Sequence, residues 1–161
     1  MEFYIREAKK KDVPQILKLI HELAVFEKEA KAVEVTTDDL ERDGFGPNKL
    51  FHCFVGENEG AIIGIALVYP RYSTWKGPAL HLEDLIVTHK MRGSGLGTAL
   101  LNEVVKYGYQ MGAKRINWEV LDWNETAISF YQSKGAKVMR DWDVVQLDDN
   151  GIKNYLDNIK D

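Results

Sequence analysis

Apolar residues recur at helical spacing in several segments of the chain. Over residues 13–27 they fall three and four positions apart, with Asp12 as the expected N-cap. Residues 95–111 have the same amphipathic pattern, and Gly112 is expected to end that helix. Shorter helices are expected over residues 37–40 and 124–134, capped by Thr37 and Asn124, and over residues 152–159.

Strands are predicted where β-branched and aromatic residues gather between turn signals. Two such runs, residues 51–57 and 61–72, flank the turn Asn58-Glu59-Gly60. Further strands are expected over residues 3–6, 79–88 and 115–121, and residues 138–147 are expected to form a final strand or hairpin. Successive strands in the middle of the chain favour antiparallel pairing, whereas a doubly wound fold alternates strand and helix more strictly. The order therefore predicts an α/β (α+β) fold with a mixed, mainly antiparallel central sheet flanked by helices.

The composition is that of one ordinary globular domain. Of the 161 residues, 45% are hydrophobic and 29% are charged, so residues 1–161 are expected to form a single domain with a buried core. No apolar run reaches the roughly 18 residues of a membrane span, and the first residues lack a signal-peptide pattern. A cytoplasmic protein without membrane contact is expected. The net charge of −4 argues against general nucleic-acid binding.

Cysteine and histidine residues provide no framework for a disulfide or a metal. Cys53 is the only cysteine, and its apolar neighbours predict a buried core thiol and not a nucleophile. The four histidines are scattered along the chain without the spacing of metal ligands. We therefore expect no metal site.

A glycine-rich loop, Arg92-Gly93-Ser94-Gly95-Leu96-Gly97-Thr98, is the strongest local motif. It follows a predicted strand and opens a predicted helix, where free N–H groups and the helix dipole favour an anion such as phosphate. The loop lacks the lysine of an ATP-binding P-loop and lies too far along the chain for a dinucleotide fingerprint. The motif fits a pyrophosphate group, and a tight turn that only packs the helix is the alternative.

The strand before this loop carries two neighbouring carboxylates, Glu83 and Asp84. Neighbours in a regular strand point to opposite faces, so both side chains reach one site only if the strand contains a bulge. Glu83 is the candidate for a general base or for an anchor of a cationic substrate. A solvated surface residue or an ion-pair partner is the alternative.

A second motif covers residues 124–136, with a helix cap at Asn124, the aromatic pair Phe130-Tyr131 and a terminating glycine, Gly135. The glycine loop and this motif, at their separation, resemble the GNAT superfamily of acyl-CoA-dependent N-acetyltransferases. The order of the predicted elements agrees with that superfamily over essentially the whole chain.

Other segments narrow the resemblance. Leu82-Glu83-Asp84 and Asp122-Trp123-Asn124 are similar to the spermidine/spermine (diamine) N-acetyltransferase family. Residues 72–77 and 120–124 are closer to its thialysine N-acetyltransferase branch. Members that acetylate polyamines carry an acid where Ser73 stands, so the resemblance implies a shorter amine than spermine. A short diamine or a thialysine-like or lysine-like side chain is expected.

The resemblance also implies the GNAT fold, acetyl-CoA as co-substrate and a homodimer. It makes Tyr131 the acid that protonates the departing CoA thiolate, and Glu83 the group that takes the amine proton through a water. The amine cleft would be lined by Phe26, Glu27, Trp75, Glu83, Asn117, Trp118 and Glu119. The coenzyme would contact Leu85, Ile86, Val87, Arg92, Gly93, Ser94, Gly95, Leu96, Gly97, Thr98, Asn124, Glu125, Thr126 and Ala127.

The expected reaction is direct transfer of the acetyl group to the amine in a ternary complex. Acetylation of a protein lysine or N-terminus is one alternative, and acetylation of spermidine or spermine is another. A non-catalytic acyl-CoA-binding regulator is the alternative outside enzymes. Glu83 and Tyr131 argue against it, because a sensor needs no proton donor at the thiol.

Overall fold

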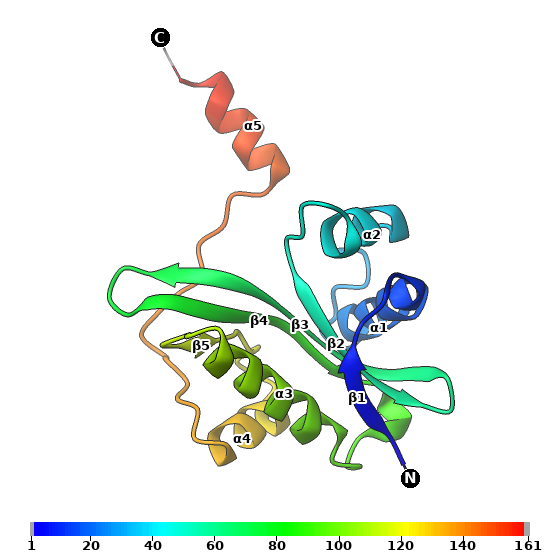
Figure 1. Cartoon of the computed structure of the whole chain (residues 1–161). Helices are drawn as coiled ribbons and strands as arrows, with labels where there is room; N and C mark the ends of the chain where they lie inside the picture. The colour runs from blue at the N-terminus through cyan, green and yellow to red at the C-terminus, as the bar shows by residue number, and fades with distance from the viewer. Residues whose placement is uncertain (1, 160–161) are drawn as a thin grey trace. The chain divides into compact units, whose positions relative to one another are not determined.

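The computed structural model describes residues 2–159, which divide into two compact units between Glu119 and Val120 (Figure 1). The elements of the first unit are β1 (Tyr4–Glu7), α1 (Val13–Phe26), α2 (Thr37–Phe45), β2 (His52–Asn58), β3 (Ala61–Ser73), β4 (Gly77–Val87), α3 (Leu96–Gln110) and β5 (Ile116–Asn117). Short 3-10 helices lie at Lys10–Asp12 and His89–Met91. The second unit contains α4 (Glu125–Ser133) and α5 (Asp149–Asp157).

The first unit is built on a five-stranded sheet in the order β1-β2-β3-β4-β5. Strands β1 to β4 pair antiparallel, and β5 pairs parallel with β4. Helices α1 and α2 lie on one face of this sheet and α3 on the other (Figure 1). The predicted mixed, mainly antiparallel sheet flanked by helices is confirmed.

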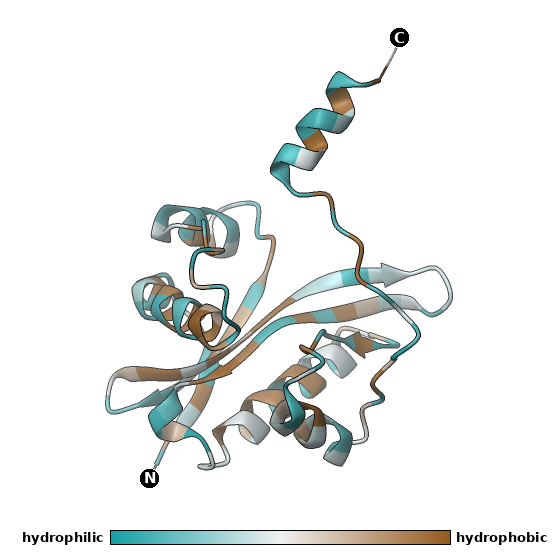
Figure 2. Ribbon diagram, turned by 180° about the vertical axis from the view of Figure 1, so that it is seen from behind, coloured by the Kyte–Doolittle hydropathy of each residue, from teal (hydrophilic) through white to brown (hydrophobic). Residues whose placement is uncertain are grey.

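Burial on both faces explains the continuous apolar run in β3. Residues 62–68 of this strand are all buried, which is typical of a strand covered on both sides. On one face, Ile65 packs in a cluster with Ile16 and Leu19 of α1. On the other face, a Cβ at Gly64 would lie 2.9 Å from the side chain of Leu96 in α3, so this helix approaches the sheet closely. Figure 2 shows the hydrophobic residues concentrated in these central strands.

Strand β4 contains a β-bulge. Asp84 pairs with Leu67, but the next pair along β3 joins Val68 to Leu82, so Glu83 is an extra residue. A bulge bends its strand, and pairing with β5 ends at His81, directly before it. The strand predicted over residues 115–121 is for this reason limited to Ile116–Asn117.

The start and end of α2 differ from the prediction. The cap is Thr36 and not Thr37, since the Thr36 hydroxyl accepts the N–H of Asp39 at 3.2 Å. In return the Asp39 carboxylate accepts the N–H of Thr36 at 2.9 Å, which completes a capping box. The helix continues past Leu40 to Phe45 because Gly44 lets it lie against the ring of Phe51.

Asp12 precedes α1 as expected, but it caps no N–H of that helix. Its buried carboxylate receives two hydrogen bonds from Arg6, at 2.7 and 2.9 Å, and one from the N–H of Lys9 at 2.7 Å. Arg6 also binds Glu57 at 2.7 Å. The ion pair with Arg6 therefore joins β1 to the start of α1, and it holds the pKa of Asp12 below its usual range.

In the second unit, α4 begins as predicted, with the N–H of Ala127 donating to Asn124 at 3.2 Å. The strand predicted over residues 138–147 is wrong. A strand needs a neighbour for its N–H and C=O groups, and none pairs with this segment in the part of the chain that the structure describes. Apart from half-buried Val138, its apolar side chains are exposed, and Val145 is 92% accessible. Along α5, hydrophobic and hydrophilic residues alternate (Figure 2).

Candidate active site

The glycine loop turns the chain from β4 into α3. Gly93 and Gly95 have φ angles of +80° and +88°, a left-handed conformation that side chains with a Cβ rarely adopt. A Cβ at either position would meet nothing within 4 Å, so the glycines serve the backbone conformation and leave open space above the loop. The first N–H groups of α3 have no acceptor within the helix, and the positive end of its dipole lies here. The loop therefore fits a phosphate group.

Helix α1 holds the loop in place. The Glu22 carboxylate accepts the hydroxyl proton of Thr88 at 3.0 Å and the N–H of His89 at 2.8 Å. The guanidinium of Arg92 lies 4.9 Å from the ring centroid of Phe26. Phe26, predicted for the amine cleft, and Arg92, predicted for the pyrophosphate, are thus in contact. Nothing in the local sequence pattern around Glu22 indicates its role, because Thr88 and His89 lie far along the chain.

Strand β4 has an open edge after its bulge. Leu85, Ile86 and Val87 pair with β3 on one side. On the other side, within residues 2–159, no strand neighbours β4 beyond His81. A strand directs its N–H and C=O groups to both sides, so this edge leaves backbone groups for an extended ligand. The predicted contact of these three residues with the pantetheine arm needs such an edge.

The bulge brings Glu83 and Asp84 to the same face of the sheet. The hydroxyl of Tyr69 donates to Glu83 Oε2 at 2.8 Å, and Tyr69 packs against the core cluster that includes α1. Asp84 pairs with Leu67, a member of the same cluster. The two carboxylates can therefore reach one site, because the strand contains the bulge that this requires.

Glu27 joins these two carboxylates, and we refer to Glu27, Glu83 and Asp84 as the acid cluster. Burial and the charges of Glu83 and Glu27 raise the pKa of Asp84 to about 6. Burial also raises the pKa of Glu27, which lies at the C-cap of α1. Like charges oppose one another's ionisation, so the acid cluster favours a bound cation.

The other residues predicted for the amine cleft divide into two groups. Asn117 of β5 lies beside the acid cluster, because its Nδ2 is 2.7 Å from His81 Nδ1 and His81 Nε2 is 3.2 Å from Glu83 Oε2. Trp118 and Glu119 directly follow β5. Trp75 lies in the β3–β4 turn and is 78% exposed. Six positions of strand separate that turn from Glu83, about 20 Å, so Trp75 is remote from the acid cluster within one chain.

Ser73 lies in the same turn. Its hydroxyl accepts the N–H groups of Trp75 and Lys76, at 3.2 and 3.1 Å. Such side-chain bonds to the backbone stabilise tight turns. Ser73 therefore has a structural role at the tip of the hairpin, whatever its effect on the choice of substrate.

The second unit carries the remaining predicted residues. Asn124, Glu125, Thr126 and Ala127 form the N-cap and first turn of α4, so each unit has predicted coenzyme residues at a helix N-terminus. Tyr131 follows on the same helix, half-buried, with its ring centroid 5.5 Å from that of Phe130.

Two side chains at the acid cluster are not among the residues predicted from the sequence. Tyr69 and His81 both contact Glu83 Oε2. His81 precedes Glu83 by two positions, the spacing of side chains on one face of a strand, and this spacing is the signal that was available. Tyr69 reaches the cluster only through the register of β3 against β4.

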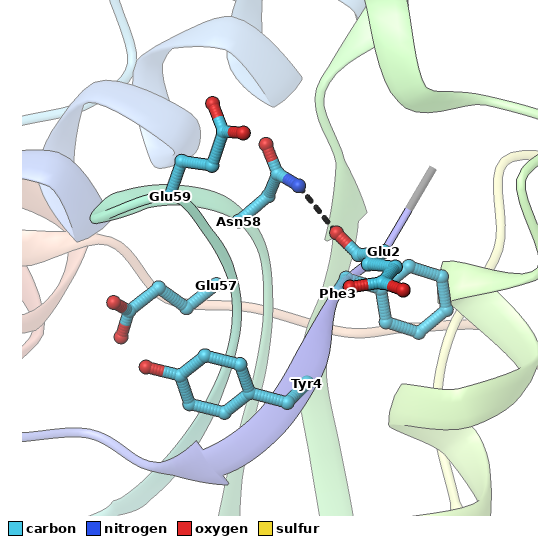
Figure 3. A pocket seen from close by; sticks show the side chains of 6 residues that line it. All are labelled: Glu2, Phe3, Tyr4, Glu57, Asn58 and Glu59. Carbon is cyan, nitrogen blue, oxygen red and sulfur yellow. Dashed lines mark hydrogen bonds between the residues drawn. The ribbon is translucent and has the colours of Figure 1, made fainter.

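A surface pocket lies elsewhere, at the β1 edge of the sheet (Figure 3). The amide of Asn58 donates to the carbonyl of Glu2 across it, and Glu57 is bound by Arg6. The lining residues are Glu2, Phe3, Tyr4, Glu57, Asn58 and Glu59. None of the predicted site residues is among them, so this pocket is not the candidate active site.

Comparison with known proteins identifies the family. Residues 13–136 match the acetyltransferase (GNAT) family. The chain belongs to the GNAT acetyltransferases. Thialysine N-epsilon-acetyltransferase of Mus musculus is 39% identical over 141 residues, covering 83% of each chain. Spermidine/spermine N(1)-acetyltransferase-like protein 1 of Homo sapiens is 38% identical over 141 residues, 83% of this chain and 20% of its own length. An integron cassette protein of V. cholerae has a TM-score of 0.80 at 22% identity and covers 99% of both chains, which supports the fold.

The GNAT match makes the protein an N-acetyltransferase, and acetyl-CoA is the co-substrate of this family. The glycine loop and the open edge of β4 fit that co-substrate. Among residues 2–159, no group of three or more His, Cys, Asp or Glu side chains is arranged to hold a metal ion. Over the same residues, no helix is long and apolar enough to cross a membrane.

We expect Gly95→Ala to weaken acetyl-CoA binding while the protein still folds. Alanine at a φ of +88° costs about 1–2 kcal/mol, and relaxation of this strain moves the N–H groups at the start of α3. The KM for acetyl-CoA should rise roughly tenfold, the effect of one lost hydrogen bond to a charged group. Gly60→Ala is the matched control, since Gly60 has a φ of +82° with open space around it in the β2–β3 turn. Equal KM values for the two variants would contradict a role for the loop.

We expect Asp84→Asn to stabilise the protein at neutral pH. Because the folded-state pKa is raised to about 6, the unfolded chain releases this proton first, and stability falls as the pH rises from about 4 to 6. The variant lacks this penalty, so its free energy of unfolding in urea should exceed that of the parent by about 1–3 kcal/mol at pH 7.5. The difference should vanish near pH 4.

Asp39→Asn provides a control of opposite sign. Hydrogen bonds from Thr36 lower the pKa of Asp39, so this variant should be less stable than the parent at pH 7.5 and equal to it at low pH. If Asp84→Asn were also less stable at pH 7.5, its carboxylate would be a stabilising group and the proposed repulsion within the acid cluster would be wrong.

Proposed function

We propose that the protein transfers the acetyl group of acetyl-CoA directly to a primary amine of a small cationic substrate, in a ternary complex. The substrate is a short diamine or a thialysine-like or lysine-like side chain. The observation that carries this proposal is the bulge in β4, which puts Glu83 and Asp84 on one face beside Glu27 and next to the open edge of the strand. An acidic site for a cation thus adjoins a backbone edge suited to an acyl-CoA.

The acid cluster has to serve two opposing needs. An alkylamine has a pKa near 10.4, so it arrives as an ammonium ion without a lone pair. Carboxylates favour this cation and thereby oppose its deprotonation. In our proposal Glu83 takes the proton through a water, and the neutral amine then attacks the thioester carbonyl. The C–N bond forms, the C–S bond breaks, and the thiolate leaves with the electron pair. The nitrogen then gives up its second excess proton, which replaces the proton that Tyr131 donates to the thiolate, so the net reaction releases one proton through Glu83.

Tyr131 protonates the departing thiolate in this scheme. A phenol with a pKa near 10 is a suitable donor to a thiolate of pKa near 8.5. Arg92 and the loop residues 93–98 hold the pyrophosphate, and residues 124–127 flank the coenzyme at the start of α4. Residues 1–161 act as a single catalytic domain, in a cytoplasmic homodimer.

Two features support the proposed substrate class: the negative charge of the acid cluster, and the lack of a carboxylate at Ser73. The relatives named for thialysine and for spermidine/spermine are almost equally similar to this chain, at 39% and 38% identity. Ser73 stands where polyamine-acetylating members carry an acid, so an anchor for the far end of a long polyamine is lacking. The charges of Glu27 and Glu83 both act on Asp84, which supports a site for a single ammonium group.

The test measures CoA release from acetyl-CoA with thialysine, lysine, putrescine, cadaverine, spermidine, spermine and a lysine peptide. We expect the highest kcat/KM with thialysine or a short diamine. Highest activity with spermine would refute the argument from Ser73, and highest activity with the peptide would make the protein a protein acetyltransferase. Tight binding of acetyl-CoA without release in any of these reactions would favour the acyl-CoA-binding regulator.

Tyr131→Phe should lower kcat roughly 100-fold, within the usual range for loss of a general acid. The KM for acetyl-CoA should change little, because the ring itself is retained. Tyr109→Phe is the matched control, since Tyr109 is 84% exposed on α3, and it should keep full activity. Turnover of natively folded Tyr131→Phe equal to that of the parent at saturating amine would exclude Tyr131 as the acid.

A further inference from the structure

Side chains from two strands contact the carboxylate of Glu83, and a third strand supports one of them. The Tyr69 hydroxyl of β3 donates to Oε2 at 2.8 Å, and His81 Nε2 of β4 lies 3.2 Å from the same oxygen. On the far side of the imidazole, Asn117 Nδ2 of β5 is 2.7 Å from Nδ1. His81 is only 6% exposed. Its ring centroid is 5.1 Å from that of Tyr69, so both groups that contact Oε2 are held by packing.

The contact with Asn117 decides where the imidazole carries its proton. An amide nitrogen can only donate, so the Nδ1 atom that faces it accepts and carries no hydrogen. The proton of the neutral ring is then on Nε2, on the side of Glu83. If the proton were on Nδ1, that N–H would face the N–H of Asn117, and two donors would meet. The lone pair of Nε2 would then point at the negatively charged carboxylate of Glu83.

Tyr69 and His81 both contact Oε2 of Glu83, and neither contacts Oε1. Burial and the hydrogen bond to Glu83 raise the pKa of Tyr69 to about 12, so its hydroxyl keeps its proton at neutral pH and stays a donor. Over residues 2–159, the hydrogen bonds of Glu83 are confined to Oε2. Oε1 is thus the oxygen that these contacts leave for a substrate ammonium or for a water that relays its proton.

We propose that His81 is a positioning residue for acetyl transfer, which Asn117 fixes in the Nε2–H form and which, with Tyr69, orients Glu83 toward the amine. This inference rests on the proposed function, in which Glu83 binds and deprotonates the amine. Without these two contacts, an exposed glutamate on a strand rotates freely, and its orientation has to be fixed each time a substrate binds. Catalytic contacts that are long in the free enzyme commonly shorten in the complex, and 3.2 Å allows this.

The first experiment is a double-mutant cycle. His81→Phe keeps a ring against Tyr69 but removes the N–H, and should lower kcat/KM for the preferred amine about tenfold with the KM for acetyl-CoA unchanged. In the Glu83→Gln background, the same substitution should have less than a twofold further effect, because His81 acts through Glu83. His81→Gln, whose amide reaches the Nε2 position, should retain most activity. His52→Phe is the control, since His52 stacks on Tyr107 away from the acid cluster, and should be unchanged.

The second experiment needs no substrate. Long-range 1H–15N correlation spectra of the free protein should show His81 with a protonated Nε2 and a bare Nδ1. Asn117→Asp replaces the donor with an acceptor, so Nδ1 should become protonated in this variant. A protonated Nδ1 in the parent protein would overturn the proposal.

The outcomes separate the two proposals. If the parent protein acetylates no amine, the proposed function fails, and the spectra still decide the state of His81. If Glu83→Gln alone has no effect on kcat/KM, the role of Glu83 fails first. If Glu83→Gln is impaired but His81→Phe keeps full kcat/KM, or loses tenfold in both backgrounds, His81 does not act by positioning Glu83.

Discussion

The bulge at Glu83 is the constraint on which the rest of the site depends. A regular strand would send Glu83 and Asp84 to opposite faces, and one of the two carboxylates would lie under α3 among apolar side chains. One extra residue in β4 keeps both on the face of α1. It also coincides with the end of pairing between β4 and β5, so a single irregularity creates both the acid cluster and the open strand edge. Bulges are often found where a strand has to redirect a side chain.

The acid cluster illustrates why binding an ammonium ion and deprotonating it conflict. The negative charge of the carboxylates favours binding of the ammonium ion but makes removal of its proton harder. The structure separates the carboxylates by their surroundings: Asp84 has a pKa raised to about 6 by burial and by its acidic neighbours, while Glu83 is exposed and contacted by Tyr69 and His81. Groups of the same type can serve different steps when their environments differ. Here Glu83 is the extra residue of the bulge, whereas Asp84 pairs with Leu67.

Local patterns predicted most of the fold. Some elements depend on contacts between residues near in sequence or on the spacing of apolar residues, and the structure has them where expected. These are helices α1, α3 and α4, the glycine loop and the central antiparallel strands. The features that could not be predicted depend on partners far away in the chain. Strand β5 is short because of a bulge some 30 positions earlier, and residues 138–147 have no strand neighbour among the residues that the structure describes. His81 meets Asn117 only through the register of two strands.

The end of α1 links the sites predicted for the two substrates. Glu22 holds the segment that leads from β4 into the glycine loop, and Phe26 lies under the guanidinium of Arg92. The next residue, Glu27, belongs to the acid cluster. Phe26 is the last residue of α1 and Glu27 is its C-cap, so the residue that contacts Arg92 directly precedes a carboxylate of the acid cluster. Lys28 follows the C-cap Glu27 in a left-handed conformation, with a φ of 63°. The chain therefore turns away from the helix axis directly after Glu27. The same helix end therefore positions the glycine loop, through Glu22 and Phe26, and supplies Glu27 to the acid cluster.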